Sequence, residues 1–311
     1  MIKIDLITGF LGAGKTTFLI EYARYLMRKG LRVGILEYDL GAINVDMLLL
    51  NRLRCDKCEL EMVAAACDAD CLSRRFKTKL IAMAMSGYDR VIVEPSGVFD
   101  MDQFYDALRE EPLENWYEIG SVITIVNANL ADDIGQEADF LLASQAACAG
   151  SIVLSRTQLS TPERIANTKK HIVDAAERIK CNKFGGRFIE KDWSEFDDAD
   201  YENIVNSGYI ISDYVKMTAG ADTSFESVSF LEVKDSLEEL QRKIKLLFSD
   251  ERYGNVLRIK GFVIEDGVSY QVNATQYELM TQPIAIGQKT LIVIGTGLNE
   301  GLIKELINNV G

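Results

Sequence analysis

The residues from Gly9 to Thr17, GFLGAGKTT, have the types and the spacing needed to bind a phosphate chain. They fit G-x-x-x-x-G-K-[ST], in which backbone N–H groups surround phosphate oxygens, the lysine reaches the β- and γ-phosphates and the hydroxyl binds Mg²⁺. Glycines allow a close approach of the backbone, and the helix that follows supplies unpaired N–H donors. The predicted nucleotide ligands are Gly9, Gly12, Ala13, Gly14, Lys15, Thr16 and Thr17, with Thr16 also on Mg²⁺. The alternative is a glycine turn that only joins a strand to a helix.

Acidic residues follow two apolar runs, at Asp39 and Glu94. In P-loop enzymes, an acid at the end of a strand holds Mg²⁺ together with the Ser or Thr of the loop. We predict that Lys15, Asp39 and Glu94 are catalytic: Lys15 neutralises phosphate charge, while the two acids hold Mg²⁺ waters or orient the attacking water. The N–H of Gly97 is predicted to contact the γ-phosphate. For Asp46 two alternatives remain: a similar role at Mg²⁺, or a position in a solvated acidic loop.

Four of the six cysteines lie between residues 55 and 71. Cys55 and Cys58 form a C-x-x-C pair, and Cys67 and Cys71 would share one face of a helix. Thiolates grouped in this way could close a tetrahedral site for Zn²⁺ or another soft divalent ion. The alternative is that the small thiols are buried and pack as apolar side chains.

The phosphate loop and the acidic residues can act together only in a fold that brings the ends of several strands to one edge of a sheet. Strand-like apolar runs at 2–8, 31–36, 91–93, 122–126 and 151–154 alternate with helical patterns at 18–29, 62–85, 139–149 and 162–178. This order predicts an α/β fold: a P-loop NTPase domain with a mostly parallel sheet over residues 1–210, then a smaller α+β domain over residues 225–311. Ligands of such sheets bind beyond the carboxyl ends of strands, which places Ser155 and Arg156 near the base.

The charge balance and the apolar runs exclude several classes of partner. The 311 residues include 34 Lys and Arg against 47 Asp and Glu, a net charge of −13. An acidic chain repels a phosphate backbone, so we expect no nucleic-acid partner. No uninterrupted apolar run approaches the length of a membrane span, and no secretion signal is recognisable at the amino end. We therefore expect a cytoplasmic protein without a membrane partner.

The residues quoted above resemble the CobW family of P-loop GTPases, relatives of the nickel-enzyme maturation factors HypB and UreG. GFLGAGKTT matches the motif of that family without change. Residues 94–97 (EPSG) are similar to its E-[ST]-[ST]-G, and residues 258–261 (RIKG) to the R-x-K-G of its C-terminal domain. The resemblance implies GTP and Mg²⁺ as ligands, slow hydrolysis, and a metal chaperone or metal-cofactor insertion factor that serves a client metalloprotein. A homodimer is a further expected assembly.

Three segments depart from the family pattern, and they keep alternatives open. Residues 67–71 (CDADC) stand where the family has C-x-C-C, Ala42 lacks a second carboxylate, and residues 155–158 (SRTQ) replace the guanine-reading N-K-x-D. Because an Asp that accepts from guanine is missing, ATP is the alternative to GTP. A nucleotide-gated binding module with little hydrolysis is the first rival function. A P-loop small-molecule kinase is the second, less favoured because no arginine-rich lid segment is present.

Overall fold

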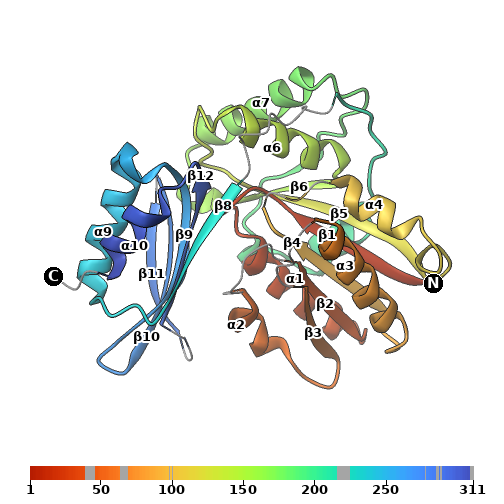
Figure 1. The fold of residues 1–311 in the computed structure, drawn as a ribbon. Helices are drawn as coiled ribbons and strands as arrows, with labels where there is room; N and C mark the ends of the chain where they lie inside the picture. Colours follow the sequence, from red (N-terminus) through yellow and green to blue (C-terminus); the bar gives the residue numbers. More distant parts are fainter. Residues whose placement is uncertain are drawn as a thin grey trace. The chain divides into compact units, whose positions relative to one another are not determined.

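The structure is a computed structural model that describes residues 1–38, 46–63, 69–97, 99, 101–215, 225–276, 278–284, 287 and 289–308. The chain forms two compact units (Figure 1). The first contains Met1–Leu40 and Leu49–Met217, and the second contains Gly41–Leu48 and Thr218–Gly311. The assignment of residues 41–48 to the second unit was not expected from the sequence. Within the described residues, no helix combines the length and apolar character needed to cross a membrane.

Strands and helices alternate along the first unit. The elements are β1 (Ile2–Thr8), α1 (Lys15–Arg28), β2 (Val33–Tyr38), α2 (Asp46–Leu50, which begins in the second unit), η1 (Asn51–Leu53), β3 (Cys58–Val63), α3 (Ala69–Ala84), β4 (Arg90–Pro95), α4 (Met101–Leu108), α5 (Leu113–Trp116), β5 (Tyr117–Asn127), α6 (Gln136–Cys148), β6 (Ser151–Ser155), η2 (Thr157–Leu159), α7 (Pro162–Arg178), β7 (Phe188–Ile189), η3 (Trp193–Glu195) and α8 (Asp198–Val205). The strands form one sheet in the order β3-β2-β4-β1-β5-β6-β7, and all the neighbouring strands run parallel. The predicted α/β fold with a parallel sheet is confirmed.

The centre of this sheet is buried on both faces. Every residue of β2 and β4 is buried, which is the pattern expected when helices cover both faces of a parallel sheet. The helix predicted over 62–85 is wrong at its start, because Met62 lies in β3 and α3 begins at Ala69. In β3, Cys58 and Leu60 are buried while Glu59 is exposed, an alternation typical of a strand with one solvated face.

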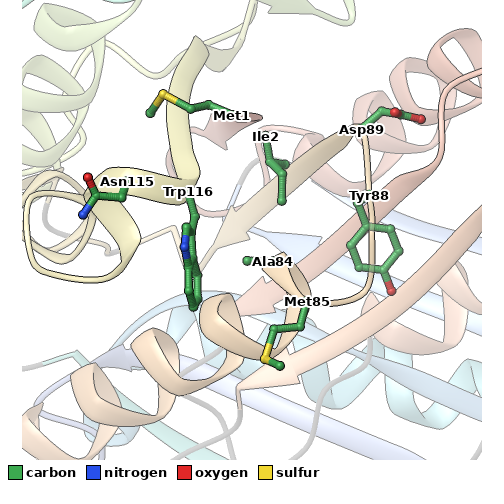
Figure 2. Close-up of a pocket in the computed structure, with 8 residues that line it drawn as sticks. All are labelled: Met1, Ile2, Ala84, Met85, Tyr88, Asp89, Asn115 and Trp116. Atoms are coloured by element: carbon green, nitrogen blue, oxygen red, sulfur yellow. The ribbon is translucent and has the colours of Figure 1, made fainter.

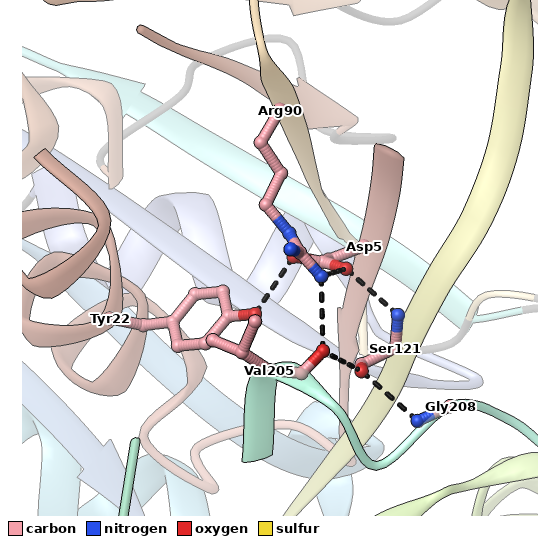
Figure 3. A network of polar contacts seen from close by, with 6 residues as sticks. All are labelled: Asp5, Tyr22, Arg90, Ser121, Val205 and Gly208. Atoms are coloured by element: carbon pink, nitrogen blue, oxygen red, sulfur yellow. Dashed lines mark hydrogen bonds and ion pairs between the residues drawn. The ribbon is translucent and has the colours of Figure 1, made fainter. Parts of the chain in front are cut away.

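A buried polar network holds β1 against its neighbours on the sheet (Figure 3). The fully buried Asp5 carboxylate accepts hydrogen bonds from Arg90 Nη2, Tyr22 OH and Ser121 N, each at 2.8 Å. Arg90 and Ser121 also donate to the carbonyl of Val205, at 3.1 and 2.8 Å. Burial, and next the charge of Asp5, raises the pKa of the Tyr22 phenol well above its usual value, so this hydroxyl remains a donor. The network fixes the strand that leads into the phosphate loop.

The second unit is an antiparallel sheet with two helices on one of its faces (Figure 1). Its elements are β8 (Phe225–Leu231), α9 (Leu237–Ser249), η4 (Glu251–Tyr253), β9 (Asn255–Glu265), β10 (Val268–Thr275), β11 (Glu278–Ile284), β12 (Thr290–Thr296) and α10 (Glu300–Asn308), and the strand order is β11-β10-β9-β12-β8. Leu240 and Ile244 of α9 and Ile303 of α10 pack in one core with Ile259 and Leu291 of the sheet. The predicted smaller α+β domain is confirmed.

The RIKG segment of β9 makes three specific contacts inside the second unit. Arg258 Nε donates to Asn273 Oδ1 at 3.2 Å, and Lys260 Nζ donates to Asp46 Oδ2 at 2.8 Å. A Cβ at Gly261 would lie 2.1 Å from the carbonyl oxygen of Thr290, so only glycine fits there. Asp46 is buried in this ion pair rather than placed in a solvated loop. Lys260 therefore anchors residues 46–48 to the five-stranded sheet.

We expect Lys260→Ala to lower the free energy of unfolding by about 3 kcal/mol, because the buried Asp46 carboxylate would lose its ion pair with Lys260. Denaturant unfolding followed by circular dichroism measures this change. Lys234→Ala, which removes an exposed lysine of the same unit, is the matched control and should change stability by less than about 0.5 kcal/mol. Equal effects of the two variants would contradict the structural role of the ion pair.

Candidate functional site

The phosphate loop joins β1 to α1 at the carboxyl edge of the parallel sheet. Gly12 and Gly14 adopt φ angles of 76° and 102°, in the left-handed region that favours glycine. A Cβ at Gly9 would lie 2.2 Å from the carbonyl oxygen of Ile125, so the loop packs directly on β5. Helix α1 begins at Lys15, and its first turn therefore points unpaired N–H groups toward the loop. All the nucleotide ligands predicted between Gly9 and Thr17 lie on this loop or this turn.

The Lys15 side chain is folded into the phosphate loop. Its ammonium donates to the carbonyl oxygen of Gly9 at 3.0 Å, and the residue is buried. The ammonium is thus held against the backbone of the loop. It can exchange the carbonyl contact for a phosphate oxygen without a large movement of the helix.

The hydroxyl of Thr16 and the carboxylate of Glu94 meet at the same edge. Thr16 Oγ1 donates to Glu94 Oε1 at 2.7 Å, although the two residues lie far apart in the sequence. Glu94 is the residue before the last of β4 and is 2% exposed. A hydroxyl and a carboxylate are hard oxygen ligands of the kind that Mg²⁺ prefers. The donor set at this position therefore fits Mg²⁺.

A second buried carboxylate, Glu37, stands beside Glu94 and was missed by the sequence analysis. Glu37 of β2 is in register with Glu94 of β4, so the two side chains leave the same face of the sheet from neighbouring strands about 4.8 Å apart. Glu37 is 3% exposed. The available signal was an acidic residue directly after the apolar run 31–36; the observed strand β2 continues through it to Tyr38. Asp39, which was predicted instead, lies outside the described residues.

The segment after β4 touches the phosphate loop at Gly97. A Cβ at Gly97 would lie 2.7 Å from the backbone nitrogen of Leu11, which leaves room for glycine alone. The Gly97 carbonyl accepts from Gln145 Nε2 of α6 at 3.4 Å. The structure thus brings Gly97 next to the loop, as a contact with the γ-phosphate requires.

The aromatic ring of Trp193 lies near the segment predicted to contact the nucleotide base, and the sequence analysis did not predict this position. Ser155 is buried at the end of β6, and Arg156 follows it with a left-handed φ of 59°. Trp193 Cη2 would lie 3.3 Å from a Cβ at Gly14, and its ring meets the ring of Phe18 edge-on at 5.6 Å. Trp193 therefore borders the phosphate loop. The signal was an aromatic residue shortly after the strand that ends at Ile189.

The four cysteines of the predicted metal site divide between the two ends of β3. Cys55 and Cys58 lie at the amino end of β3. Cys71 is in the first turn of α3, which follows the carboxyl end of β3. The strand spans roughly 16 Å, and sulfur ligands lie about 2.3 Å from zinc, so Cys58 and Cys71 are not ligands of one ion in this fold. Cys67 lies outside the described residues. Among the described residues, no three Cys, His, Asp or Glu side chains converge in a metal site.

A pocket of about 460 Å³ opens at the opposite edge of the sheet, near the amino ends of β1 and β4 (Figure 2). Figure 2 shows Met1, Met85 and Trp116 around Ile2. The phosphate loop leaves the other end of β1, so this pocket does not belong to the nucleotide edge. Trp116 is thereby placed away from the loop that Trp193 borders.

The fold and the glycine loop define a P-loop nucleotide-binding domain. Residues 3–182 match the family model described as CobW/HypB/UreG, nucleotide-binding domain, and the chain belongs to this family. The resemblance seen in the sequence is confirmed.

Two relatives and one solved structure illustrate the similarity. The zinc chaperone YeiR of Escherichia coli is 26% identical over 164 residues, 52% of this chain and 49% of YeiR. The zinc chaperone YjiA of Escherichia coli is 28% identical over 170 residues, 51% of this chain and 50% of YjiA. The chain spans about half the length of these curated relatives. The crystal structure of Zn(II)-bound YjiA GTPase from E. coli is 18% identical, with a TM-score of 0.36, and covers 98% of this chain and 97% of that chain.

Proposed function

We propose that the protein is a slow, Mg²⁺-dependent GTPase that acts as a cytoplasmic metal chaperone or metal-cofactor insertion factor. The observation that carries this proposal is the convergence of Lys15, Thr16 and Glu94 at the glycine loop. Family membership supports nucleotide binding. The zinc chaperones among the relatives support a metal as the cargo, and a client metalloprotein as the partner.

The proposed hydrolysis depends on positioning and on charge neutralisation. Lys15 binds β- and γ-phosphate oxygens, and the N–H groups of the loop and of Gly97 orient the γ-phosphate. Thr16 and Glu94 would hold Mg²⁺, which neutralises charge that develops on the phosphate oxygens. Asp39 keeps its predicted role in orienting the attacking water, and Glu37 is added as a neighbour of Glu94 that can accept a proton or a water hydrogen bond.

The base is proposed to stack on Trp193, which borders the loop at Gly14. Stacking on an aromatic ring contributes about 1–3 kcal/mol per base and does not depend strongly on which base is bound. Ser155 and Arg156 remain the proposed neighbours of the base. GTP is the proposed nucleotide, and an ATP affinity higher than that for GTP would overturn this assignment.

Trp193 fluorescence should report nucleotide binding. The chain has two tryptophans, so Trp116→Phe leaves Trp193 as the only one. We expect GTP with Mg²⁺ to change the emission of Trp116→Phe, and to leave that of Trp193→Phe unchanged because Trp116 lines the pocket at the opposite edge. Trp193→Leu should weaken GTP and ATP binding alike, by roughly tenfold, measured by calorimetry. Nucleotide affinity that is unchanged in Trp193→Leu would show that the base does not stack on Trp193.

The proposed cargo site uses Cys67 and Cys71. Of these, Cys71 lies in the first turn of α3, beyond the carboxyl end of β3 and so near the sheet edge that holds the phosphate loop. We expect Cys67→Ser with Cys71→Ser to lose one zinc ion per chain when protein is purified under reducing conditions and analysed for metal. Acidification should weaken binding in the wild type as the thiolates protonate. Cys181→Ser, at a partly exposed thiol elsewhere, is the control. Full zinc content in the double variant would show that Cys67 and Cys71 are not zinc ligands, and only the proposed nucleotide function would remain.

The first rival, a nucleotide-gated binding module with little hydrolysis, is separated by a single-turnover assay. Ala42 in place of a carboxylate and the SRTQ segment favour it. Tight GTP binding without phosphate release over many hours would support the rival. The homodimer expected from the sequence stays a prediction, which analytical ultracentrifugation with and without GTP can test.

A further inference from the structure

Cys55 and Cys58 pair through their backbones at the amino end of β3, and Cys55 contacts Met27, at a position that the proposed function does not use. Residues 55–58 form a tight turn in which Cys55 N donates to Cys58 O and Cys58 N donates to Cys55 O, both at 3.0 Å. Residues that exchange both backbone hydrogen bonds face each other with Cα atoms about 5.5 Å apart, and their side chains leave the same face. The Cys55 S–H donates to Met27 Sδ of α1 at 3.8 Å.

This turn is separated from the nucleotide edge by the length of the sheet. Cys58 pairs with Val33 at the start of β2, whereas the proposed nucleotide and cargo sites follow the carboxyl ends of the strands. Cys55 is exposed and Cys58 is buried, so an ion could enter from solvent and be covered on one side by protein. The sulfur cluster is therefore a candidate site of its own.

We propose that Cys55, Cys58 and Met27 form a binding site for a soft monovalent cation, Cu(I). Thiolate and thioether ligands select Cu(I), and three sulfurs leave the four-coordinate requirement of structural zinc unmet. If both sulfurs lie about 2.3 Å from a shared ion, a sulfur–sulfur separation of 3.8 Å corresponds to an angle of about 110° at the metal. The thiol proton now between Cys55 and Met27 occupies the place that the ion would take.

Two thiolates and one Cu(I) carry a net charge of −1. The exposed charges beside them balance, with Arg54 and Lys57 against Asp56 and Glu59. Binding releases two protons, one from each thiol.

The test uses a variant that lacks the proposed cargo ligands, Cys67→Ser with Cys71→Ser. This protein is titrated with Cu(I) without oxygen, against the chromogenic competitor bicinchoninate. We expect one Cu(I) per chain, weakened about tenfold by Met27→Leu and at least a hundredfold by Cys55→Ser. Cys181→Ser in the same background is the matched thiol control and should leave the affinity unchanged. Affinities that are the same in all these variants would overturn the site.

Two further measurements keep the result independent of folding and of the proposed GTPase. Cys55 is exposed and Met27→Leu nearly conserves volume, so neither change should disturb the fold, which circular dichroism checks. X-ray absorption at the copper edge should show a first shell of three sulfurs, and a shell dominated by nitrogen or oxygen would contradict the assignment. Because the titration contains no nucleotide, its outcome does not depend on GTP hydrolysis.

Discussion

Lys15→Ala should reduce the rate of GTP hydrolysis by at least about a hundredfold, the effect expected when a single charged or hydrogen-bonding group that stabilises the transition state is removed. Lys15 is the cation whose ammonium already lies inside the glycine loop, 3.0 Å from the Gly9 carbonyl. Its loss leaves the charge that develops on the γ-phosphate to Mg²⁺ and the backbone N–H groups. Phosphate release at saturating GTP, compared with a single-turnover experiment, measures the loss in the chemical step.

Lys29→Ala is the matched control for this experiment. Lys29 caps the other end of α1, where it forms an exposed ion pair with Asp198 at 2.9 Å. Its removal takes one positive charge from the same helix without approaching the loop, so hydrolysis should stay near the wild-type rate. If Lys15→Ala is folded and still hydrolyses GTP like this control, the glycine loop is not the catalytic site.

Asp5→Ala should produce the largest loss of stability in the first unit, about 4 kcal/mol of the free energy of unfolding. The substitution leaves the Arg90 guanidinium buried without its carboxylate, and it removes the acceptor of Tyr22 OH and Ser121 N. Removing one partner of a buried ion pair is far more destabilising than breaking a pair on the surface. Urea unfolding followed by circular dichroism measures the change.

Glu118→Ala provides the surface comparison, because Glu118 forms a solvent-exposed ion pair with Lys3 on the same strands at 2.7 Å. We expect it to change stability little. Since β1 leads into the phosphate loop, Asp5→Ala should also weaken nucleotide binding at temperatures where the variant begins to unfold. A variant as stable as wild type would show that the network in Figure 3 does not hold β1 in place.

The proposed cargo site and the proposed copper site lie at opposite ends of β3, which changes how the cysteine-rich segment is understood. Cys71 lies in the first turn of α3, beyond the carboxyl end of β3. At the amino end of β3, Cys55 contacts Met27 and Cys58 pairs with Val33 at the start of β2. The cysteines between residues 55 and 71 therefore belong to two separate proposed sites.

The glycine loop could be predicted in detail because phosphate binding there depends on contiguous residues. The backbone N–H groups, Lys15 and Thr16 all belong to one stretch, and their spacing alone specifies the geometry. The alternation of apolar runs and helical patterns likewise predicted the parallel sheet, since a strand buried on both faces must be apolar throughout. Glu94 was recognised because its strand end lies near the loop in any such sheet.

Contacts between distant segments were decided by strand register and by folding of loops onto the sheet. Glu37 pairs with Glu94 only because β2 and β4 are neighbours in that register, and Trp193 reaches Gly14 from a segment almost 180 residues away in the sequence. The short strand β3 separates Cys58 from Cys71, which spacing along the chain had suggested were together. Local pattern determines which residues can perform chemistry, whereas register and strand length, which depend on the packing of the whole sheet, determine which of them meet.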